Sequence, residues 1–88
     1  FTMGTIYPIL NIIGISLPVN KSAKFCGLKI SEANFPEWMR IAFIQRQVDT
    51  NKWENMRPSP DKLIIEGDRL TMFCNPDRVA ELEKRFKV

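Results

Sequence analysis

Residues 63–87 read LIIEGDRLTMFCNPDRVAELEKRFK, and this order of residue types predicts a short strand, a tight turn, a second strand and a helix. In the part RLTMFC the residues Leu70, Met72 and Cys74 alternate with Arg69, Thr71 and Phe73, which is the period-2 pattern of a β-strand. Gly67 lies in the turn, where its lack of a Cβ permits a positive φ. Such a unit needs a partner sheet, which the rest of the chain must supply.

The helix at the end of this segment has a clear beginning and one apolar stripe. Asn75 is a favoured N-cap residue, and Pro76 follows at the first helical position, where a missing N–H costs nothing. The apolar residues then recur at helical spacing, and they are Val79, Leu82 and Phe86. This spacing predicts a helix that packs one face on the sheet.

The composition is that of one small globular domain. The chain has 88 residues, of which 44% are hydrophobic, and a net charge of +3. The charges of both signs are interspersed, which does not favour a nucleic-acid partner. There is no histidine, so histidine-based triads and Cys/His zinc sites are excluded within this sequence. The two cysteines, Cys26 and Cys74, lie far apart and are expected to be reduced, buried thiols.

No group of residues predicts catalysis or metal binding. The serines have no histidine to activate them, and there is no phosphate-binding glycine motif. Glu66 and Asp68 flank a turn glycine, a position where acidic residues make local hydrogen bonds. We therefore expect neither an enzyme, nor a metal site, nor a cofactor.

The beginning of the chain differs from the rest. A Met at position 3, behind two other residues, predicts that residues 1–8 are a cloning scar or linker and that the domain comprises residues 9–88. The apolar run at residues 6–17 contains Pro8, Asn11, Gly14 and Ser16. It is too short and too interrupted to span a bilayer.

The remaining segments complete an α+β fold. Strands are expected at residues 9–17, 38–45 and 53–57, and a first helix at residues 27–34, before the strand and helix described above. The order is β-α-β-β-β-α, a small and mostly antiparallel sheet with two helices on one face. The first strand is apolar on both faces, which indicates burial on both sides or contact with a second copy. The predicted dimer-interface residues are Ile12, Ile13, Ile15 and Leu17.

Several short motifs together resemble one known family. They are FCGLKI at 25–30, FPE at 35–37, IAFIQR at 41–46, PSPD at 58–61 and IEGDRL at 65–70. In this order and spacing they resemble the TrkA-C domain, the C-terminal lobe of the RCK regulators of potassium channels and cation transporters. The resemblance covers residues 13–86.

The resemblance implies a cytosolic, non-catalytic sensor that forms homodimers and acts on a membrane-embedded channel or transporter part. In several members of the family a cleft between the two copies binds a nucleotide second messenger, cyclic di-AMP. Apolar side chains would stack on the bases, while basic and amide groups would meet the phosphates. The residues expected to line such a cleft are Ile15, Leu17, Asn20, Lys21, Ser22, Lys24, Arg40 and Arg46.

Other interpretations stay open at this stage. The loop containing Lys21 and Lys24 is also typical of a solvated connection. The domain could be a structural dimerisation module without a small ligand. It could also be the lobe of a DNA-associated regulator, although the last helix alternates acids and bases and has no cluster of cations.

Overall fold

The computed structural model describes residues 3–7 and 11–87. They form one five-stranded sheet, one α-helix and two single-turn 3₁₀ helices. The strands are β1 (Met3–Tyr7), β2 (Ile12–Pro18), β3 (Arg40–Asp49), β4 (Lys52–Met56) and β5 (Arg69–Cys74). The helices are η1 (Ile30–Glu32), η2 (Pro76–Arg78) and α1 (Val79–Lys87). The predicted α+β class is confirmed.

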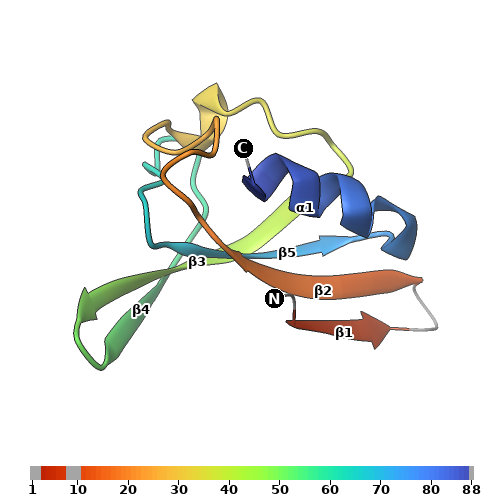
Figure 1. The fold of residues 1–88 in the computed structure, drawn as a ribbon, viewed down its shortest axis with the longest axis horizontal. Coiled ribbons are helices and arrows are strands. Elements are labelled where there is room, and N and C mark those ends of the chain that lie inside the picture. Colours follow the sequence, from red (N-terminus) through yellow and green to blue (C-terminus); the bar gives the residue numbers. More distant parts are fainter. Residues whose placement is uncertain (1–2, 8–10, 88) are drawn as a thin grey trace.

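The sheet is antiparallel throughout, with the strand order β1-β2-β5-β3-β4. β5, which the pattern RLTMFC predicts, lies in the middle between β2 and β3 (Figure 1). Its residue Met72 is opposite Ile15 of β2 and Ile41 of β3. Because directly opposite residues share one face of a sheet, the inward residues of these three strands form a continuous apolar surface.

One layer of structure covers this apolar surface. α1 and the irregular segments 19–39 and 57–68 lie on the same side of the sheet (Figure 1). Leu82 and Phe86 of α1 are buried there together with Leu70 and Met72 of β5. Fully burying one such side chain stabilises the fold by about 1.5–3 kcal/mol. The apolar stripe of α1 predicted from the sequence therefore packs on the sheet, as its helical spacing indicates.

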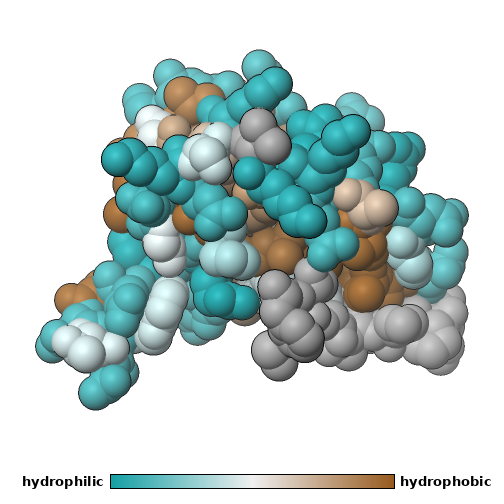
Figure 2. Space-filling view, viewed as in Figure 1, coloured by the Kyte–Doolittle hydropathy of each residue, from teal (hydrophilic) through white to brown (hydrophobic). Residues whose placement is uncertain are grey.

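The opposite face of the sheet carries no helix within the described residues (Figure 1). On that face the hydroxyls of Ser16 and Thr71 are 2.6 Å apart and share a hydrogen bond, and Phe73 is 37% exposed. The β3–β4 hairpin projects from the body (Figure 1), and its surface is mostly hydrophilic or intermediate with one small hydrophobic patch (Figure 2). Val48 and Trp53 on this hairpin are 48% and 44% exposed.

β3 contains an irregularity that changes which residues face the core. Its register with β5 shifts between Ile41 and Phe43, as in a β-bulge. Strict alternation predicts Ile41 and Phe43 on one face, but in the structure Ile41 shares the core face with Ile44, which is fully buried. Phe43 is instead opposite Thr71, on the face without a helix.

The turn and the cap around β5 follow the prediction. Gly67 has φ +90°, which only glycine adopts without strain. The Asn75 side chain accepts a hydrogen bond from the backbone N–H of Asp77 at 3.0 Å, and Pro76 begins η2, which leads directly into α1. The N-terminal cap is thus formed by the residue expected for it.

The predicted helix at residues 27–34 is wrong. Only η1 forms there, because the backbone donors of this segment bond to another part of the chain. The N–H groups of Gly27, Ile30 and Ser31 donate to the carbonyls of Ile64, Lys62 and Pro60 at 2.7–3.0 Å. Gly27 and Asn34 also have positive φ values of 87° and 53°, which end a right-handed helix on either side. One α-helix covers the sheet, where two were predicted.

The first strands also differ from the prediction. β1 comprises Met3–Tyr7 and pairs with β2, so these residues belong to the sheet and are not a linker. Residues 1, 2 and 8 of the predicted scar or linker, and 9 and 10 of the predicted first strand, lie outside the described residues. The second predicted strand, 38–45, corresponds to β3 at Arg40–Asp49, and the edge strand at 53–57 corresponds to β4.

Candidate functional site

Arg46, a predicted ligand contact, makes structural bonds in the fold. Its Nε and Nη2 donate to the two carboxylate oxygens of Asp68, each at 2.9 Å, and Nη2 also donates to the carbonyl of Leu63 at 2.8 Å. Hydrogen bonding to the Asp68 carboxylate raises the pKa of Arg46 above its usual value. Two of the three guanidinium nitrogens are therefore used to hold β3 to the turn before β5.

Two further predicted contacts, Asn20 and Ser22, bond to the end of α1. The Asn20 amide donates to the carbonyl of Phe86 at 3.3 Å, and the Ser22 hydroxyl lies 3.5 Å from the carbonyl of Lys87. The last carbonyls of a helix have no partner within the helix, so donors from another segment satisfy them. This loop closes the C-terminal end of α1, while its Lys21 and Lys24 side chains are exposed.

The assignment of β2 residues to a ligand wall and a dimer interface needs correction. Ile15 is 1% exposed and Leu17 is 5% exposed, so both side chains belong to the protomer's own core. Ile13 is partly buried against the same core. These side chains have little or no surface left for a ligand or second copy. Ile12 alternates with them and lies on the opposite face of β2, where it is partly exposed.

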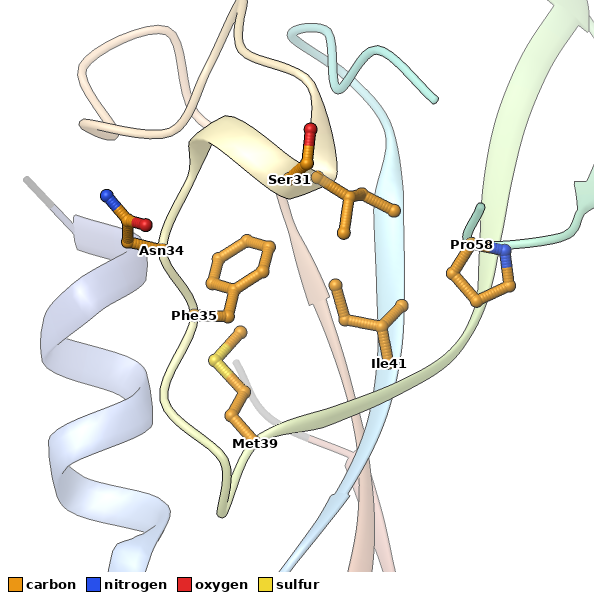
Figure 3. Close-up of a pocket in the computed structure, with 7 residues that line it drawn as sticks. Ser31, Asn34, Phe35, Met39, Ile41 and Pro58 are labelled. Atoms are coloured by element: carbon orange, nitrogen blue, oxygen red, sulfur yellow. The ribbon is translucent and has the colours of Figure 1, made fainter. Parts of the chain in front are cut away.

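A different part of the surface is hollowed. A cavity of about 380 Å³, which we call the β3 hollow, lies between η1, the start of β3 and the segment after β4 (Figure 3). Its lining residues are Ile30, Ser31, Asn34, Phe35, Met39, Ile41 and Pro58. Figure 3 shows Phe35, Met39 and Ile41 pointing toward one another at its base. The hollow thus has an apolar base with a few polar groups at its rim.

The polar residues at the rim come from the turn at residues 27–34, which the sequence pattern predicted as a helix. Ser31 belongs to η1 and is exposed, and Asn34 is exposed with φ +53°. The volume of the hollow lies within the ~300–1,000 Å³ typical of small-molecule sites, and its exposed lining combines apolar side chains with polar groups. Arg40 is exposed and is opposite Phe73, on the other face of the sheet from Ile41. The Arg40 side chain therefore does not line the hollow.

The first part of β3 next to the hollow has one open edge. β4 pairs with β3 only from Ile44 onward, whereas β5 pairs with β3 from Arg40. Among the described residues, no strand pairs with Arg40–Phe43 on the side away from β5. An open strand edge presents backbone donors and acceptors that another strand can pair with. The hollow and this edge lie side by side on the same segment of chain.

Other kinds of site are not found in the part of the chain that the structure describes. No group of three or more His, Cys, Asp or Glu side chains there is placed to hold a metal ion. Cys26 and Cys74 are free thiols, and burial raises the pKa of the Cys74 thiol. No helix among these residues has both the length and the hydropathy needed to cross a membrane.

The residues of the hollow were not predicted from the sequence, for a physical reason. Met39 and Ile41 lie at alternate positions of the strand predicted at 38–45, and Ile30 lies in the helix predicted at 27–34, and neither regular element predicts a cavity. The dense apolar and proline-containing run at 35–41 was the available signal, because proline and a preceding left-handed Asn34 prevent a regular covering helix.

Comparison with known proteins agrees with this fold. The family model of the TrkA-C domain matches residues 15–87. The chain belongs to the TrkA-C domain family. This confirms the resemblance drawn from the motifs, and it identifies a regulatory domain of the type found in potassium and other cation transport proteins. TrkA-C domains typically associate with transport proteins and self-assemble. No curated protein matches the chain. The matched range of this TrkA-C domain contains every residue of the β3 hollow and the Arg46–Asp68 pair.

Proposed function

We propose that this TrkA-C domain is a non-catalytic, cytosolic regulatory module of a potassium or cation channel or transporter, and that it acts as a homodimer. A nucleotide second messenger of the cyclic di-AMP type binds at the seam between two copies. The observation that carries the proposal is the β3 hollow beside an open strand edge, on a fold of a regulatory family. Binding regulates the attached transport part only if the ligand prefers one arrangement of the dimer over another.

The lining of the hollow suits one base of a dinucleotide. Phe35 and Ile41, which are partly exposed, offer apolar surface for stacking above the buried Met39, and the Ser31 hydroxyl and Asn34 amide are available for polar edges. A ligand with two identical bases has the symmetry of a two-fold dimer, in which both copies present the same surface. One base in each hollow would join the two copies.

The open edge of β3 supports the position of the seam. Residues Arg40–Phe43 have backbone groups on the side away from β5 that a second copy can pair with. Antiparallel pairing of this segment with its counterpart would bring two hollows to the same interface.

The proposal is tested by measuring assembly and ligand binding on the isolated chain. Sedimentation velocity at high micromolar concentration is expected to give a dimer, with a larger dimer fraction in the presence of cyclic di-AMP. Thermal unfolding with cyclic di-AMP at 100 times its dissociation constant is expected to show a stabilisation of about 2.7 kcal/mol. A monomer under all conditions overturns the proposal. A dimer that no cyclic dinucleotide, ATP or NAD stabilises indicates a purely structural dimerisation module.

A charge change at the rim locates the ligand. Asn34→Asp keeps the shape of the side chain, and aspartate also tolerates the positive φ at this position, but the change places a negative charge at the hollow. We expect affinity for cyclic di-AMP to fall about five-fold, because a like charge near 4 Å costs about 1 kcal/mol in water. The matched control is Asn55→Asp, on exposed β4, which changes the net charge equally and should leave affinity unchanged.

A further inference from the structure

A second depression, with a different set of lining side chains from the β3 hollow, lies between α1 and the loop that precedes β3. Its volume is about 680 Å³, and we call it the basic groove. Its lining residues are Lys24, Phe25, Leu28, Ala33, Phe35, Glu81, Lys84 and Arg85. Phe35 lines both the groove and the hollow, so its ring stands between them. The other lining residues of the groove have no part in the function proposed above.

The floor of the groove is apolar and held in place by aromatic contacts. Phe25 is 5% exposed and makes edge-to-face contacts with Phe35 and with Phe86 of α1, at centroid distances of 5.3 Å and 4.9 Å. Such contacts stabilise an aromatic pair by about 0.5–1.5 kcal/mol beyond the buried area. Because the rings are fixed by the core, the floor is formed before any ligand arrives, and a ligand does not have to order it.

The rim of the groove is positively charged. Lys24, Lys84 and Arg85 are exposed, and none of them has an ion-pair partner among residues 3–7 and 11–87. The one acidic lining residue, Glu81, is paired with Arg78 at 3.4 Å. Three cations therefore line the rim above an apolar floor. The one acidic side chain in the lining, Glu81, is partly neutralised by Arg78.

The size of the groove argues for a small molecule. Its volume lies within the ~300–1,000 Å³ of small-molecule sites, whereas a specific protein partner needs roughly 800 Å² of surface from each side. We propose that the basic groove binds a small amphipathic anion, with its apolar body on Leu28, Ala33 and Phe35, above the buried Phe25, and its carboxylate or phosphate head between Lys24, Lys84 and Arg85. A nucleotide lacks the long apolar body, and a neutral or cationic amphiphile lacks the charge that this rim selects.

The test is an NMR titration of the full chain with three probes that share one alkyl chain: octanoate, octyl phosphate and octylammonium. Octanoate and octyl phosphate are expected to shift the backbone amides of Phe25, Leu28 and Lys84 and to bind at least about ten-fold more tightly than octylammonium, because three cations favour the anion. The ratio of the two anions identifies whether the natural head is a carboxylate or a phosphate. Equal binding of octylammonium, or no shift at these amides, overturns the proposal.

Variants with equal charge changes separate the groove from general attraction. Lys84→Gln with Arg85→Gln removes two rim cations, and Lys52→Gln with Arg57→Gln removes two exposed cations elsewhere. The first pair of changes should weaken octanoate binding roughly ten-fold, and the second should change it less than two-fold. Equal weakening by both pairs overturns the proposal. Cyclic di-AMP is absent from these measurements, so a negative result overturns the anion site at the basic groove and leaves the proposed nucleotide function untouched. A failure of cyclic di-AMP to bind likewise leaves the anion site untouched.

Discussion

Arg46 and Asp68 are joined by two parallel hydrogen bonds of 2.9 Å, from the guanidinium Nε and Nη2 to the two carboxylate oxygens. The side chain of Asp68 is 1% exposed and that of Arg46 is 25% exposed. The carboxylate also accepts from the backbone N–H of Ile65 at 3.1 Å, and the guanidinium also reaches the carbonyl of Leu63. One ion pair therefore connects β3, the segment before the turn and the turn itself.

Removing the cation of this pair should destabilise the fold strongly. Arg46→Met leaves a buried carboxylate without its charge partner, and we expect a loss of about 2–4 kcal/mol in the free energy of unfolding, measured by urea denaturation. The control is Glu81→Gln, which breaks the exposed Arg78–Glu81 pair, leaves the contact of Arg78 with the Trp38 ring, and should cost less than about 1 kcal/mol. A similar small loss for both variants would contradict the structural role of the buried pair.

A second prediction concerns the turn glycine. Gly67→Ala places a Cβ at φ +90°, and since no atom lies within 4 Å of that Cβ, the cost comes from backbone strain alone. We expect a loss of about 1–2 kcal/mol in unfolding free energy. Gly67→Asn should lose less, because asparagine tolerates positive φ better than alanine. If alanine and asparagine variants were both as stable as the parent chain, the turn would have a different conformation in solution.

A third prediction tests the closure of α1 by the loop after β2. Asn20→Ala removes the amide that donates to the carbonyl of Phe86, and should cost about 1 kcal/mol in unfolding free energy. Amide hydrogen exchange in the last turn of α1 should also become faster, because that turn frays. Lys21→Ala, at the next and exposed position, is the control and should change neither quantity measurably. Identical exchange in both variants would argue against the contact.

A fourth prediction follows from the raised pKa of Cys74, whose cause is burial. The folded state holds the thiol proton more tightly than the unfolded state, in which the pKa is about 8.5. The contribution of this group to stability is therefore complete below about pH 8.5 and is lost as the pH rises through the folded-state value. Stability at pH 7 and at pH 9.5 should differ more for the parent chain than for Cys74→Ala, by at most about 1.4 kcal/mol for each pH unit. An equal difference in both proteins would show that Cys74 ionises alike in the two states.

The elements set by neighbouring residues were predictable from the sequence. Alternation in RLTMFC, the positive φ of Gly67 and the Asn75–Pro76 cap are local properties, and the structure confirms each of them. The helix stripe of Leu82 and Phe86 follows from 3.6-residue periodicity and is also observed. The family was predictable as well, since it depends on the order and spacing of such motifs.

The β3 hollow, by contrast, depends on contacts between distant segments. Residues 27–34 have helical spacing, but their backbone donors bond to residues 60–64, and this pairing replaces a helix with a turn that leaves space beside Ile41. The bulge between Ile41 and Phe43 further moves Phe43 off the core face and places Ile44 on it. Both effects arise from strand and segment pairing, which periodicity along one segment does not contain.

The same distinction explains the predicted ligand residues. Residue type alone marks Arg46, Asn20 and Ser22 as groups able to bind an anion or a polar ligand, but it does not tell which partner each one meets. In the folded chain the nearest partners are Asp68 and the last carbonyls of α1, and they take these donors. Local sequence thus set the turns, the cap and the strand faces, because these depend on dihedral preferences and side-chain period. Long-range packing assigned the polar side chains and formed the cavity, because a hydrogen bond forms only between groups that the fold brings together.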